Sequence, residues 1–157
     1  MYFYGSESTS MIQRIQTVYL LLAALLGGFI SFYDPNLWRA RLVNNTYQYF
    51  TGQSSYLYFT LLMIIVALAV VCIFLFKKRP LQFRLTVINV LVTVAIIALQ
   101  YLKIKAEAAK LQDTQMLASS TYLPAAFLPV VILVLLFLAA RGIYKDQRLV
   151  RSLDRLR

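Results

Sequence analysis

Three polar side chains within an apolar stretch, Thr86, Asn89 and Thr93, have the types and spacing that could form a binding site. Intervals of three and four residues place them on one face of a helix. Hydroxyl and amide groups on such a face can bind a neutral substrate, or they can hydrogen-bond a neighbouring helix inside a membrane. For Asn89 we favour helix-to-helix bonding, with this face directed into a bundle.

The chain lacks the residue combinations of familiar membrane enzymes. It has no histidine and a single cysteine, Cys72, so a Ser–His pair, a C-x-x-C redox pair and the commonest metal ligand are excluded. We therefore expect no catalytic residue, no metal and no cofactor. Ion-coupled transporters normally keep an ionisable residue inside the membrane, and the long apolar segments contain none. The sequence predicts a protein that is not an enzyme.

Composition places these residues in a membrane protein. The chain has 157 residues, of which 61% are hydrophobic and 14% are charged, whereas soluble domains are about half apolar and a quarter charged. A membrane-spanning helix needs about 20 mostly apolar residues. Four segments meet this requirement, at residues 15–33, 56–76, 85–102 and 122–140. We expect residues 1–14 to be an N-terminal cytoplasmic extension, 15–140 a four-helix bundle and 141–157 a cytoplasmic tail.

The positions of the basic residues predict the orientation. Of the 16 Lys and Arg residues, 11 lie in the N-terminal segment, the second connection or the tail. Basic residues collect on the cytoplasmic side of a membrane, so both termini are predicted to be cytoplasmic and the first and third connections to face outward.

The two outward connections differ in pattern. In the first, RLVNNTYQYF (residues 41–50) alternates weakly around Asn44-Asn45, which fits either a short hairpin or an ordered loop. In the third, KIKAEAAKLQDTQ (residues 103–115) is rich in helix formers and can extend the third helix beyond the bilayer. The predicted fold class is an all-α membrane protein: four transmembrane helices with both termini inside, followed by a basic amphipathic C-terminal helix.

Small residues in the first apolar segment predict close helix packing. Ala23, Gly27 and Ser31 repeat every four residues, with Gly28 beside them. Small side chains let helix backbones approach closely in lipid. We favour packing within the chain over dimerisation for this stripe.

The C-terminal segment RGIYKDQRLVRSLDRLR reads as a basic amphipathic helix. Leucines gather on one side and arginines on the adjacent side. The residues concerned are Arg141, Arg148, Leu149, Arg151, Leu153, Arg155 and Leu156. Such a helix can lie on anionic lipids as a topology anchor or dock on a protein partner. Binding to nucleic acid is not expected, because no recognisable nucleic-acid-binding module is present.

Three segments together resemble a known family. MIQRIQTVYLLLA, FKKRPLQFRL and the C-terminal RGIYKDQRLVRSLDRLR are similar to small four-helix inner-membrane proteins of Bacteroidetes-type bacteria that form a domain-of-unknown-function family (DUF4293 type). The resemblance runs from about Met11 to Arg157 and is most specific in the tail. It implies the same topology and a bacterial inner-membrane location, and it implies no activity.

Two functions of different kinds remain. The first is a non-catalytic accessory or assembly subunit of a larger membrane complex, which binds other membrane proteins or further copies of itself. The second is a small channel or carrier for a neutral or lipid-like substrate. The second function would require the face of Thr86, Asn89 and Thr93 to line a path.

Overall fold

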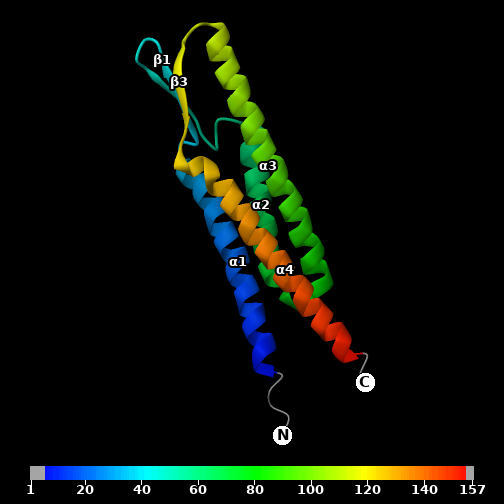
Figure 1. Ribbon diagram of the computed structural model, residues 1–157. Helices are drawn as coiled ribbons and strands as arrows, with labels where there is room; N and C mark the ends of the chain where they lie inside the picture. Colours follow the sequence, from blue (N-terminus) through cyan, green and yellow to red (C-terminus); the bar gives the residue numbers. More distant parts are fainter. Residues whose placement is uncertain (1–5, 155–157) are drawn as a thin grey trace.

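The computed structural model describes the backbone of residues 6–154 and the side chains of residues 15–148. Four long helices run side by side: α1 (Ser6–Tyr33), α2 (Tyr56–Phe74), α3 (Arg79–Asp113) and α4 (Leu128–Asp154) (Figure 1). All four are long and apolar enough to cross a membrane. The chain is therefore a membrane protein by helix length and composition.

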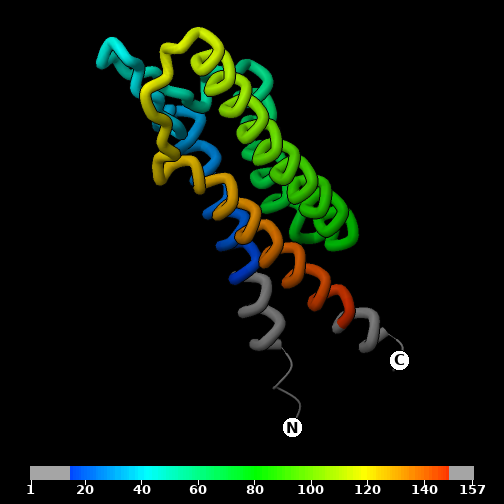
Figure 2. Tube along the Cα trace, turned by 45° about the horizontal axis from the view of Figure 1, so that its top comes forward, coloured from blue at the N-terminus to red at the C-terminus, as the bar shows by residue number. Residues whose placement is uncertain are grey.

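The helices form a closed up-and-down bundle. Each helix packs against its neighbours in sequence, and α4 completes the ring by packing against α1. Short connections favour such antiparallel neighbours. The connection between α2 and α3 is only the 3₁₀ turn η1 (Leu75–Lys77) and Lys78. The beginning of α1 and the end of α4 lie at the same end of the bundle (Figures 1 and 2), which we call the tail end.

The buried face of each helix repeats at intervals of three and four residues. In α2 the buried positions are Tyr58, Leu62, Ile65, Ala69 and Cys72. In α3 they are Gln82, Thr86, Asn89, Thr93, Ile96, Gln100 and Ile104. This spacing is that of helices packed at a shallow crossing angle with interlocking side chains. The outward faces carry large exposed apolar residues such as Leu91 and Phe137, as expected for surfaces in contact with lipid.

A small antiparallel sheet covers the opposite end of the bundle, which we call the sheet end. Its strands are β1 (Trp38–Leu42), β2 (Tyr47–Phe50) and β3 (Leu117–Tyr122), in the order β2-β1-β3. A hairpin joins β1 to β2, with Asn45 at a φ of 67°, a left-handed conformation that asparagine tolerates. Trp38, Ala40 and Phe50 point from the sheet into the core. The all-α prediction holds for the four long helices but not for the connections between them. The first connection forms the hairpin that was one of its two predicted alternatives, and the strand in the third connection was not predicted.

The connection between α3 and α4 has helical structure at both of its ends. The third helix does continue well past Leu102, because α3 ends at Asp113. A 3₁₀ turn, η2 (Pro124–Phe127), leads into α4, and Pro129 is the second residue of that helix. Proline is well tolerated at a helix start, where its missing N–H would have no partner. Pro124 thus begins the 3₁₀ turn, and Pro129 lies in the first turn of α4.

Candidate functional site

A row of polar side chains on α3 lies in the interior of the bundle. Asn89 is fully buried, and its Nδ2 donates to the main-chain oxygen of Ile65 on α2 at 3.1 Å. The other amide atom, Oδ1, has no hydrogen-bond partner among the described residues. The hydroxyls of Thr86 and Thr93 donate to carbonyls of their own helix, four residues earlier, at 2.8 Å. Asn89 thus joins two helices. The Thr86 hydroxyl also lies 3.6 Å from Cys72 Sγ of α2, whereas the Thr93 hydroxyl is bonded within α3.

The same row joins the helices at two further levels. Toward the tail end, Gln82 Nε2 donates to the main-chain oxygen of Cys72 at 3.0 Å, which joins α3 to α2. Toward the sheet end, Tyr58 Oη donates to Gln100 Oε1 at 3.0 Å. Gln100 Nε2 in turn donates to the Ala126 oxygen at 3.1 Å. Side-chain amides that donate hydrogen bonds to main-chain carbonyls of a neighbouring segment have partners for their polar atoms inside an apolar bundle.

A buried ion pair lies at the tail end of the bundle. Arg79 Nη1 of α3 is 3.0 Å from Asp146 Oδ2 of α4, with side-chain exposures of 26% and 3%. Gln147 Nε2 donates to the Arg79 main-chain oxygen at 2.7 Å. Gln16 of α1 is also buried, and its Cγ lies 2.8 Å from where a Cβ on Gly142 would be. Three helices therefore meet at this cluster.

Asp146 is the buried charge that the sequence did not reveal. It lies in the segment predicted to be a cytoplasmic amphipathic basic tail, and three of its near neighbours are basic. A signal exists in hindsight, because Ile132, Leu136, Ala139, Ile143 and Asp146 continue one spacing of four and three residues, and all are buried. The bundle interior thus extends past residue 140, and α4 crosses that residue without a break.

The small-residue stripe of α1 packs within the chain at three of its positions. Ala23 and Ser31 are buried, and a Cβ on Gly27 would lie 2.7 Å from Val66 Cγ2 of α2. Ser31 Oγ donates to the Gly27 oxygen at 2.9 Å. Gly28 does not share this role, because nothing lies within 4 Å of its Cβ position. Close approach of α1 and α2 therefore depends on Gly27.

The tail residues are only partly described. Arg141 and Arg148 are exposed on α4. The side chains of Leu149, Arg151 and Leu153 lie outside the described residues, as do Arg155 and Leu156 altogether. The α-helix expected for the tail is present as far as Asp154.

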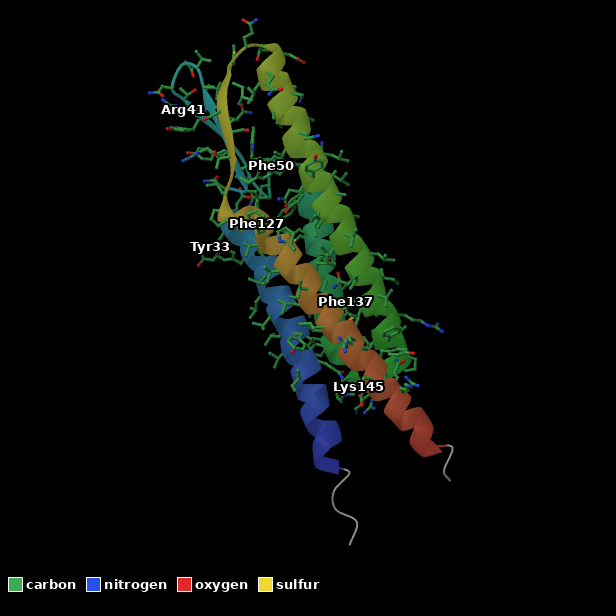
Figure 3. The ribbon with its side chains drawn as sticks, viewed as in Figure 1. Tyr33, Arg41, Phe50, Phe127, Phe137 and Lys145 are labelled. Carbon is green, nitrogen blue, oxygen red and sulfur yellow. The ribbon has the colours of Figure 1, made fainter. Side chains whose placement is uncertain are left out.

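An open cleft of about 780 Å³ lies at the sheet end. Its walls come from β1, β2, the start of α2 and the C-terminal part of α3. The lining residues are Trp38, Gln48, Tyr49, Phe50, Ser54, Ser55, Tyr56, Leu57, Lys103 and Glu107. Figure 3 shows Phe50 between the sheet and the bundle, while Arg41 lies out on the hairpin. The cleft therefore combines aromatic rings, hydroxyls and one charge of each sign.

Strand β2 borders the cleft and is an edge strand of the sheet. Leu42 donates to the Thr46 oxygen at 2.9 Å at the start of the β1–β2 ladder. Hydrogen-bonded and non-bonded pairs alternate along an antiparallel ladder, so the backbone groups of Tyr47 and Tyr49 are directed away from β1. No described strand pairs with that free edge. An unpaired edge of this kind is a template for a further strand.

Comparison with known proteins identifies the family and nothing more specific. No curated protein and no solved structure matches the chain. The family described as "Domain of unknown function (DUF4293)" matches residues 12–156, which include all four candidate membrane spans, the sheet and the buried ion pair. This chain therefore belongs to the DUF4293 family of unknown function.

Proposed function

We propose that this protein is a non-catalytic subunit of the bacterial inner membrane, an accessory or assembly component of a larger membrane complex. In this proposal it binds an extended segment of a partner protein at the sheet end. The observation that carries the proposal is the free edge of β2 beside the cleft of about 780 Å³. An extended peptide can add to such an edge through main-chain hydrogen bonds, while its side chains enter the adjoining cleft.

The interior of the bundle also supports a structural role. The amides of Gln82, Asn89 and Gln100 bond carbonyls of neighbouring segments. Each of these groups is thereby used to hold the fold together. The basic residues at the tail end support the predicted orientation, with the sheet end facing outward.

A channel or carrier for a neutral or lipid-like substrate is the second candidate. The unpaired, buried Oδ1 of Asn89 favours it, because an unsatisfied acceptor could bond a passing donor. The geometry of Thr86 and Thr93 disfavours it, since both hydroxyls already donate within α3. Asn89 also does not line the cleft at the sheet end.

The test is purification of the tagged full chain from its native membrane in mild detergent, with companions identified by mass. Tyr49→Pro removes a backbone N–H at the free edge and leaves the β1–β2 bonds in place. Ser120→Pro is the matched control, because it makes the same change at the free edge of β3. A stoichiometric partner that is lost with Tyr49→Pro and retained with Ser120→Pro is the expected result.

A cysteine cross-link shows whether the partner touches the edge itself. The native Cys72 is buried, so a cysteine introduced in place of the exposed Tyr47 supplies an accessible thiol. We expect this variant to cross-link the same partner. A small homo-oligomer with no partner, unchanged by Tyr49→Pro, would overturn the proposal and favour transport assays.

Truncation distinguishes the sheet end from the tail as the docking surface. The cut belongs after Arg148, because a cut before Asp146 would break the buried ion pair with Arg79. We expect the partner to remain bound after this truncation. Loss of the partner would show that the tail is the docking helix.

A further inference from the structure

An apolar groove lies between α3 and α4 on the outside of the bundle, toward the tail end. It has a volume of about 330 Å³ and is lined by Phe83, Val87, Val90, Phe137, Ala140, Arg141 and Tyr144. Six of these seven residues present carbon-rich side chains, and Arg141 is the one cation. Figure 3 shows Phe137 and Lys145 along α4, with Lys145 nearer the tail end. The groove thus runs from an apolar region of α4 toward a basic one.

Three described basic residues lie around the tail end of this groove. Arg141 lines the groove, Arg84 follows Phe83 in α3, and Arg148 lies seven residues beyond Arg141 on the same side of α4. All three side chains are exposed. The nearby acid, Asp146, is buried against Arg79, so it does not neutralise them. Among the side chains that the structure describes, an anionic group at the mouth of the groove would therefore meet arginines.

The apolar wall and the cationic mouth of the groove together indicate which kind of molecule can bind there. A docked protein helix would bury Arg141 in an apolar contact, which is costly without a partner of opposite charge. A phospholipid fits both parts, because an acyl chain covers the apolar wall and its phosphate remains at the level of the arginines. Arginine suits phosphate through charge-assisted hydrogen bonds.

We propose that the groove between α3 and α4 binds an anionic phospholipid, with an acyl chain along Val87 and Phe137 and the phosphate on Arg141. This lipid site is separate from the cleft at the sheet end, and it does not depend on the proposed subunit function. It also differs from a general attraction of the basic tail to the membrane, since it requires the shape of the groove as well as its charge.

The experiment is native mass spectrometry of the purified full chain with phosphatidylglycerol or phosphatidylcholine. Arg141→Gln removes the charge, and Val87→Trp fills the groove. Lys78→Gln and Ile88→Trp are the matched controls, because Lys78 and Ile88 do not line the groove. Thermal unfolding of each variant confirms that it is folded.

The wild-type chain is expected to retain phosphatidylglycerol in preference to phosphatidylcholine. Arg141→Gln should lower the retained phosphatidylglycerol about fivefold, the effect of one basic residue near the membrane surface. Val87→Trp should abolish retention of both lipids, and the controls should match the wild type. Equal retention by Val87→Trp and Ile88→Trp would overturn the site.

A second measurement covers the case in which a variant does not fold. Phosphatidylglycerol with a photoactivatable acyl chain is added to the wild-type protein, and the labelled peptides are identified. Label on the peptides of Val87 and Phe137 supports the site. Label spread evenly over all exposed helix faces would refute it, as would a dimer that protects the groove and excludes lipid.

Discussion

Breaking the Arg79–Asp146 ion pair tests whether the tail end of the bundle is held by a buried charge. The two partners differ in burial, since the side chain of Asp146 is 3% exposed and that of Arg79 is 26% exposed. Arg79→Met would leave a buried carboxylate with no partner, which costs about 3–5 kcal/mol in buried pairs. Asp146→Asn would leave a guanidinium that still reaches water, so we expect a loss of about 1–3 kcal/mol.

The double variant Arg79→Met/Asp146→Leu should recover much of this loss. Replacing both members of a buried pair by apolar side chains is often close to neutral. Arg84→Met, an exposed change in the same helix, is the control and should fall within about 0.5 kcal/mol of the wild type. The free energy of unfolding would be measured in detergent through the fluorescence of the single tryptophan, Trp38, which is buried.

Two results would refute this reasoning about the ion pair. If Asp146→Asn lowered the free energy of unfolding more than Arg79→Met, burial would not determine which of the two variants is less stable. A double variant whose loss equals the sum of the two single losses would show that the two charges are not coupled.

Three further changes probe the packing and the polar row. Gly27→Ala places a Cβ 2.7 Å from a side-chain atom of α2 and should cost about 1–3 kcal/mol of stability. Gly28→Ala places its Cβ in open space, so it should be neutral or slightly stabilising. Equal unfolding curves for the two variants would contradict this difference. Asn89→Leu should cost about 0.5–2 kcal/mol with partner binding intact, and loss of transport without loss of stability would instead identify a path residue. Tyr58→Phe removes the 3.0 Å bond to Gln100 and should lower the unfolding free energy by about 1 kcal/mol; an unchanged midpoint of chemical denaturation would argue against that bond.

The sequence predicts the membrane-spanning segments well because length and hydropathy suffice for that purpose. A bilayer about 30 Å thick requires about 20 apolar residues per helix whatever the packing. The first three predicted segments lie within the candidate spans, and the fourth begins two residues before its span, which starts at Pro124. The extension of the third helix follows from intrinsic propensity. The hairpin was one of two interpretations, because Asn44-Asn45 is a weak turn signal and β3 has no strong strand pattern of its own.

The location of the buried faces depended on the tertiary structure. In water, the apolar side of a helix marks its buried face, but in lipid both sides are apolar and that contrast disappears. The buried face of α3 is marked instead by polar residues such as Gln82, Asn89 and Gln100. The sequence indicated Asn89 in this role, but it gave no partner for Asn89, and Ile65 became evident only when α2 and α3 were placed together.

The sequence by itself determined that the chain crosses a membrane and carries an excess of basic residues toward one end. These properties follow from the composition of each segment, which can be read without knowing which residues are in contact. The tertiary structure alone decided that Asp146 is buried against Arg79 and that β3 joins the β1–β2 hairpin. Both features bring together residues far apart in sequence, and only the packed bundle sets which side chains and strands then meet.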